Sequence, residues 1–286
     1  MTNVVAYRGH QNPVWDVDWS PMGIYFTTAS RDRTARLWST DRTSTLRIYA
    51  GHSSDVDVST IKCLKASEAH LKQCVRFHPN SLYIATGSSD WTARLWDVQR
   101  GTSVRVFIGH QGIVSTLAFS PDGRYLATTG KRTVTTSRHL MNEPPLGEDL
   151  SIILWDLGSG RRIKKMTGHT ASVYSLAFSA ESSVLVSGGA DWTVRCWDVK
   201  SSGGLPETSR NGIGGSHGSH PHSKDPGPDV IETWVVHDFL GTFFSWNRRT
   251  DLAATFPTKR TPITTVHFTP RNLCLVAGPY LSTTPR

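Results

Sequence analysis

The chain has 286 residues, of which 37% are hydrophobic, and a formal net charge of +8. It contains no apolar run near the roughly 18 residues that a membrane span needs, which argues against a membrane protein. The positive charge would attract acidic proteins or nucleic acid, but Lys and Arg are scattered over many turns, so we expect nucleic-acid contact that is at most non-specific. The N-terminus lacks the basic start and apolar stretch of a secretory signal, which predicts an intracellular protein.

A Gly-His dipeptide recurs along the first part of the chain. Each copy precedes an alternating apolar stretch, a turn, a second such stretch, an Asp-x-Thr or similar turn, and a tryptophan. Alternation with a period of two predicts strands, and Pro121-Asp122-Gly123 is typical of the turn between two of them. The sequence therefore predicts one four-stranded unit per repeat. The copies are Gly9-His10, Gly51-His52, Gly109-His110 and Gly168-His169.

This pattern resembles the WD40 family, whose repeat of roughly 40 to 45 residues folds as one propeller blade. The resemblance implies an all-β fold, a WD40 β-propeller, in which a His, a Ser or Thr, a turn Asp and a Trp form a hydrogen-bonded structural tetrad. Buried His, Asp and indole groups each need such a partner. The sequence does not identify which Ser or Thr is the hydroxyl member. By resemblance the other members are His10, Asp32 and Trp38; His52, Asp90 and Trp96; His110, Asp149 and Trp155; His169, Asp191 and Trp197.

Two segments lengthen the repeats. Successive Gly-His pairs are 42, 58 and 59 residues apart, and removing residues 58–73 and 131–147 restores the period. Codons for Val58-Ser59 and Gln73 can match consensus intron borders, and those for Gly130-Lys131 allow the same interpretation of the second insert. We therefore interpret both inserts as aberrant, translated introns. The alternative is a pair of genuine surface loops, which propellers tolerate because loop entropy grows slowly with length. The first insert falls within an expected inner strand, where it would interrupt pairing.

The remainder of the chain is less regular. Residues 201–230 are Gly, Ser, His and Pro with almost nothing apolar, which predicts a disordered loop. Residues 231–286 contain three short strand patterns, which predict a partial last blade with a further candidate insert at 234–249. The chain start resembles an outer strand. With residues 1–200 as the main blades, we expect an incomplete propeller, a fragment with about four blades and two part-blades of the about seven that close a ring.

Several stretches go beyond generic WD40 sequence, among them PVWDVDWSPMGIYFTTASRDRTARLWSTD and FPTKRTPITTVHFTPRNLCLVAG. They resemble the C-terminal propeller of the TBP-associated factor five family, the WD40 subunit of general transcription factor TFIID and, in fungi, of the SAGA coactivator. The resemblance implies a nuclear scaffold in RNA polymerase II transcription initiation whose partners are histone-fold subunits. The alternative is another WD40 adaptor, such as a substrate receptor of a cullin-RING ubiquitin ligase, whose Trp-Asp-x-Arg box is approached only by Trp197 to Lys200.

No motif indicates an enzyme. The sequence has no G-x-S-x-G, P-loop or H-E-x-x-H pattern and no unrepeated carboxylate pair, so we expect no catalytic residue, small-molecule substrate or cofactor. The four cysteines and the loop histidines lack the spacing of a metal site, so we expect no metal. Trp91 and Trp192 each follow the turn Asp and are candidate partner contacts. The alternative for each ring is stacking on Arg94 or Arg195.

Overall fold

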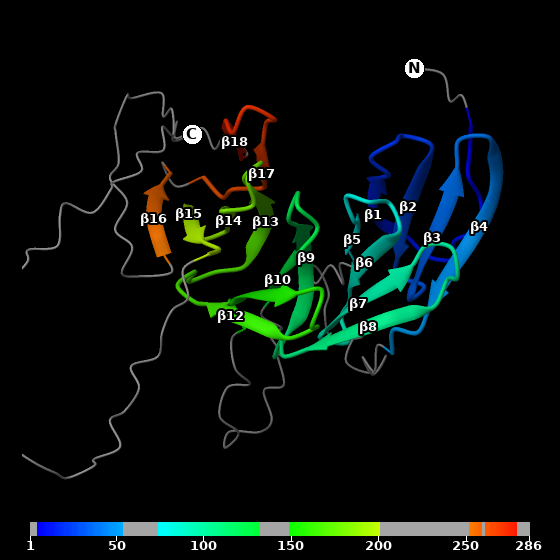
Figure 1. Cartoon of the computed structure of the whole chain (residues 1–286), viewed down its shortest axis with the longest axis horizontal. Helices are drawn as coiled ribbons and strands as arrows, with labels where there is room; N and C mark the ends of the chain where they lie inside the picture. The colour runs from blue at the N-terminus through cyan, green and yellow to red at the C-terminus, as the bar shows by residue number, and fades with distance from the viewer. Residues whose placement is uncertain (1–4, 54–73, 132–148, 201–251, 259–260, 279–286) are drawn as a thin grey trace, which may run out of the picture.

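A computed structural model describes residues 5–53, 74–131, 149–200, 252–258 and 261–278 (Figure 1). These ranges form antiparallel β-sheets, and none of them contains a helix, let alone one long and apolar enough to span a bilayer. The inserts at 58–73 and 234–249, the loop at 201–230 and all but Lys131 of 131–147 lie outside the described residues. The hypotheses about them stay predictions. Sequencing mature transcripts across codons 57 to 74 tests the first.

Four sheets have four strands each, in chain order. Blade 1 consists of β1 (Val14–Trp19), β2 (Tyr25–Ser30), β3 (Thr34–Ser39) and β4 (Arg42–Ala50). Blade 2 consists of β5 (Cys74–Phe77), β6 (Tyr83–Gly87), β7 (Thr92–Asp97) and β8 (Ser103–Ile108). Blade 3 consists of β9 (Ile113–Phe119), β10 (Tyr125–Lys131), β11 (Ile152–Asp156) and β12 (Arg162–Met166). Blade 4 consists of β13 (Val173–Phe178), β14 (Val184–Gly189), β15 (Thr193–Asp198) and β16 (Leu252–Pro257).

The two ends of the chain differ from the expected arrangement. The sequence assigned three strands to the last blade, but β16 pairs with β15 and completes blade 4, which leaves β17 (Thr265–Phe268) and β18 (Cys274–Ala277) as the two-stranded part-blade 5. Pairing covers the backbone groups that β15 would otherwise expose at a sheet edge. Residues 5–10, expected as an outer strand, form no strand, and none of the described strands pairs with them.

The blades follow one another around an open arc (Figure 1). The first strands contact in succession: β1 with β5, β5 with β9, β9 with β13, and β13 with β17. Each hydrophobic core lies between two neighbouring blades. Between blades 2 and 3, for example, Leu95 and Phe107 pack with Val114, Leu126 and Trp155. Burial of one side of every blade against the next is therefore what holds the described sheets together.

Each blade has two ends, and all blades point the same way. We call the tetrad face the end with the loop before the first strand and the turn between the second and third strands. There Val114 N donates to Ser88 O at 3.0 Å, from blade 3 to blade 2. At the opposite face, His78 Nε2 donates to Gly123 O at 2.9 Å, from blade 2 to blade 3. Corresponding ends of neighbouring blades thus lie side by side.

A basic side chain on the fourth strand joins each of the first three blades to the next. Arg47 Nε donates to Gln99 O at 3.2 Å, Arg105 Nη2 to Gly158 O at 2.7 Å, and Lys164 Nζ to Asp198 O at 3.0 Å. Gln99 and Gly158 lie in the turn between the third and fourth strands of the following blade, and Asp198 is the last residue of the third strand, β15. All three donors stand four positions before the Gly of a Gly-His pair. The repeat therefore places the same contact at each of these interfaces.

Candidate functional site

The predicted tetrad residues meet inside each of the four blades. In blade 3, His110 Nδ1 lies 2.6 Å from Asp149 Oδ2, and His110 Nε2 lies 2.8 Å from Thr128 Oγ1. Trp155 Nε1 donates to the same hydroxyl at 2.9 Å. One hydroxyl therefore links the ring of the loop histidine to the indole of the third strand, and the histidine links both to the turn carboxylate.

The structure also shows the hydroxyl members that the sequence left open. Each lies on the second strand of its blade, and the same contacts span 2.7 to 2.9 Å in blades 1, 2 and 4. In those three blades the hydroxyl stands ten positions before the Trp, because the turn between the second and third strands has a constant length. That spacing is the signal from which it could have been found. The four hydroxyl residues are Thr28, Thr86, Thr128 and Ser187.

The turn Asp uses both carboxylate oxygens. Asp90 Oδ2 accepts from His52 and from Ser53 N, while Asp90 Oδ1 accepts from Thr92 N at 3.0 Å and Thr92 Oγ1 at 2.7 Å. Burial alone would raise the pKa of Asp90, but the hydrogen bonds from His52 and Thr92 outweigh it and lower the pKa to about 2. Asp191 has the equivalent partners His169 and Thr193 in blade 4, which lower its pKa to about 2. The carboxylate thereby joins the loop before the first strand to the turn before the third.

The Gly of the Gly-His pair packs closely against the tetrad Trp. A Cβ on Gly51 would lie 3.1 Å from Arg94 Nη1 and 3.2 Å from Trp96 Cη2. The Cη2 atom of the tetrad Trp would also lie 3.2 Å from a Cβ on Gly109. A side chain here would crowd the tetrad Trp, so either the ring or the loop before the histidine would have to shift by a few tenths of an ångström.

The sequence did not predict the pair of carboxylates that lies between blades 1 and 2. Asp16 Oδ2 accepts from Arg76 Nη1 at 2.5 Å and from Val75 N at 3.2 Å, and Asp18 Oδ2 accepts from Phe77 N at 2.7 Å. Burial raises the pKa of Asp18 despite these contacts. The backbone N–H groups of β5 therefore bind carboxylates of β1, where a paired strand would offer backbone carbonyls. Nothing in the sequence marks this role, because the partners are about 60 residues apart.

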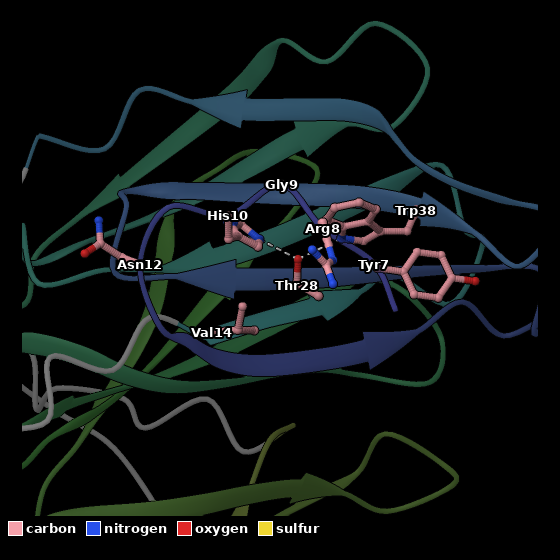
Figure 2. A pocket seen from close by; sticks show the side chains of 8 residues that line it. All are labelled: Tyr7, Arg8, Gly9, His10, Asn12, Val14, Thr28 and Trp38. Carbon is pink, nitrogen blue, oxygen red and sulfur yellow. Dashed lines mark hydrogen bonds between the residues drawn. The ribbon is translucent and has the colours of Figure 1, made fainter. Parts of the chain in front are cut away.

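The same tetrad contacts recur in all four blades. Within the described ranges, no three His, Cys, Asp or Glu side chains gather as metal ligands. A hollow of about 440 Å³ opens beside the tetrad of blade 1, and Arg8, His10, Val14 and Trp38 are among its lining residues (Figure 2). There His10 Nε2 is already 2.7 Å from Thr28 Oγ1. The geometry is that of a repeated interior brace.

The candidate contacts Trp91 and Trp192 occupy equivalent turns on the tetrad face. Their exposed fractions are 45% and 46%, and their φ angles are 65° and 60°. Within the described residues neither ring has a cation over it. Arg94 instead lies 5.9 Å from the ring centroid of Trp96, and Arg195 Nε donates to Thr193 Oγ1. Both indoles are thus presented to the surroundings of the propeller.

The successive four-stranded blades and their repeated tetrads define a β-propeller of the WD-repeat class. The family model described as WD40, "WD domain, G-beta repeat", matches residues 1–39, 43–97, 101–136 and 160–198, which is more than half of the chain. The chain therefore belongs to the WD40 family, and the predicted fold class is confirmed. WD40 domains mediate protein–protein interaction, so the coarse assignment is a protein-interaction scaffold.

Several known proteins are similar to this chain. Subunit 5 of transcription initiation factor TFIID from Caenorhabditis elegans is 34% identical over 183 residues, which are 64% of this chain and 23% of that protein. Nuclear distribution protein nudF from Aspergillus niger is 27% identical, over 70% of this chain and 53% of that protein. A guanine nucleotide-binding protein subunit beta from Oryza sativa subsp. japonica is 28% identical, over 70% of this chain and 48% of that protein. The chain spans at most about half of the length of these relatives.

Proposed function

We propose that this chain is a non-catalytic scaffold, the WD40 subunit of a TFIID-type or SAGA-type complex that acts in RNA polymerase II transcription initiation in the nucleus. The observation that carries the proposal is the 34% identity to a TFIID subunit over 64% of the chain. The chain is also similar to proteins with other names, nudF and a G-protein β subunit among them, so the repeats alone do not identify this role.

The geometry supports a scaffold. Each tetrad ties a loop, two strands and a turn together through hydrogen bonds of 2.6 to 2.9 Å, so the loops at this face have little conformational freedom left to lose. Preorganised surfaces bind partners with a smaller entropy cost. In this proposal the twelve His, Asp and Trp residues are structural, and the partners are histone-fold transcription factor subunits that pack on the loops and blade faces.

The test is affinity purification of the tagged full chain from nuclear extract. We expect TFIID-type subunits, histone-fold subunits among them, to co-purify with the wild-type chain. A Val114→Asp chain provides the control, because a charge at this fully buried position disrupts the packing of blades 2 and 3 and should abolish recovery. Recovery of cullin-ligase subunits without transcription factor subunits would contradict the proposal and favour the adaptor alternative.

A further inference from the structure

The tetrads fix the turns that lie at the tetrad face. In blades 1, 2 and 4 the residue after the tetrad Asp is Arg33, Trp91 or Trp192. The preceding carboxylate holds the turn from both sides, as described for Asp90. In blade 4 the carbonyl of Trp192 also accepts from Thr258 N at 2.8 Å. These three side chains therefore project from a rigid base.

The same three residues have a backbone conformation that suits large side chains poorly. Their φ angles of 66°, 65° and 60° lie in the left-handed region, where glycine and asparagine are favoured. The left-handed positions in the first-to-second-strand turns of the opposite face hold small residues instead, namely glycine, serine or asparagine: Gly23, Ser81, Gly123, Ser182 and Asn272. Large residues in this conformation occur only at the tetrad face within the described ranges. Strained conformations of this kind persist where the surrounding structure holds them, and they cluster at functional sites.

Among the described residues of the tetrad face, the exposed charged side chains are basic. Its described carboxylates are those of the tetrads, at most 8% exposed and each paired with a histidine. The other described acidic residues lie on β1, in turns of the opposite face, or at the end of a third strand next to that face: Asp16, Asp18, Asp41, Asp97, Asp122, Asp156, Glu181 and Asp198. On the tetrad face of blade 1, Arg8, Arg31 and Arg33 are exposed, and their side chains make no hydrogen bond or ion pair within the described residues.

We infer that the tetrad face binds an acidic protein segment that carries aromatic or aliphatic side chains. The arginines of blade 1 attract its carboxylates, and Trp91 and Trp192 bury its apolar groups; aromatic anchors on a preorganised base are typical of binding hot spots. A nucleic-acid strand fits less well. It needs a basic groove along its backbone, whereas the described tetrad-face loops and turns of blades 2 and 4 contain no Lys or Arg. The inference rests on the proposed scaffold function and names the chemistry of one partner.

The test is a fluorescence-anisotropy titration of the full chain with a labelled synthetic peptide of repeating Asp-Phe-Asp-Leu units. Two control peptides carry Lys in place of Asp, or Ser in place of Phe and Leu. We expect only the first peptide to bind, and to bind at least about tenfold more weakly to a chain with Trp91→Asn and Trp192→Asn. Asparagine suits the left-handed turn, so the melting temperature of this variant should be unchanged or higher.

Two further variants locate the site. A chain with Arg31→Glu and Arg33→Glu should lose binding of the acidic peptide. The matched control is Leu82→Asn, which removes a side chain of similar exposure, 50%, from the opposite face and should bind like the wild type. The inference is overturned if the wild-type chain binds no acidic peptide, if the Trp variants bind it equally well, or if a single-stranded oligonucleotide displaces it and needs the same tryptophans.

The peptide titration tests the inference and the affinity purification tests the proposed function, so either can give a negative result without the other. Specific peptide binding by a chain that recovers no TFIID-type subunits leaves this inference standing and contradicts the proposed function. Recovery of those subunits by a chain that binds no acidic peptide overturns the inference alone.

Discussion

Blades 1 and 3 contain the same internal brace in different surroundings. Val14 and Val17 on β1 are 48% and 53% exposed, whereas the equivalent residues on β9, Val114 and Leu117, are 0% and 1% exposed. The tetrad distances of the two blades nevertheless agree within about 0.1 Å. A tetrad therefore depends only on its own blade, while burial of the first strand depends on a preceding blade. Local hydrogen bonding and packing between blades are separate sources of stability.

The largest difference in stability between the two blades should follow from placing a charge on the first strand of each. Val114→Asp buries a carboxylate beside Gly87 without a cation, and we expect it to lower the free energy of unfolding by about 3–5 kcal/mol. Val14→Asp leaves the carboxylate in water and should change the free energy of unfolding by about 0.5 kcal/mol or less. Urea unfolding followed by tryptophan fluorescence measures both. Equal losses would show that β1 is covered by another part of the chain.

Removing the shared hydroxyl should give the next largest effect. Thr128→Val leaves His110 Nε2 and Trp155 Nε1 without a partner in the interior, and we expect a loss of about 2–3 kcal/mol. Thr28→Val should cost less, because Thr28 lines the hollow beside blade 1, where water can replace the lost bonds (Figure 2). Thr128→Ser keeps the hydroxyl, as Ser187 does in blade 4, and is the control. An equal cost in both blades would refute the difference in solvation.

Acid should weaken the blades through the turn carboxylates. Hydrogen bonds lower the folded-state pKa of Asp90 and Asp191 from 3.8 to about 2, and that of Asp149 further. Their contribution is complete above about pH 4 and is lost as the pH falls toward about 2, at roughly 2 kcal/mol for Asp90. The slope of unfolding free energy against pH should therefore be smaller for Asp90→Asn than for the wild-type chain. Parallel curves between pH 5 and pH 2 would argue against this origin.

The smallest effect is expected at the contact between fourth strands and neighbouring turns. Arg105→Ala removes hydrogen bonds to the carbonyls of Gly158 and Ser159, and we expect a loss of about 1 kcal/mol. Arg47→Ala removes a single bond of 3.2 Å to the next blade and should cost less. Arg105→Lys retains one charged donor and is the control. Thermal unfolding of the three chains ranks them, and an unaffected Arg105→Ala chain would show that the apolar interface suffices.

Much of the fold and of the tetrads was predictable because both arise within one repeat. The period-two alternation and the turn residues predict the strands, and the needs of a buried His, Asp and Trp are met by neighbours in the same blade. The hydroxyls of Thr28, Thr86, Thr128 and Ser187 were missed because many Ser and Thr residues occupy the strands. Only the register between the second and third strands selects the one that faces the indole.

By itself the sequence determined the repeat, its strands and the composition of each brace, since these depend on residues close together within a blade. Tertiary structure alone decided which blade receives β16, why Val14 is exposed while Val114 is buried, and that Asp18 accepts from Phe77 of the next blade. These outcomes depend on strand pairing and on contacts between blades. Their partners are far apart along the chain, and the short-range pattern of residues carries no record of them.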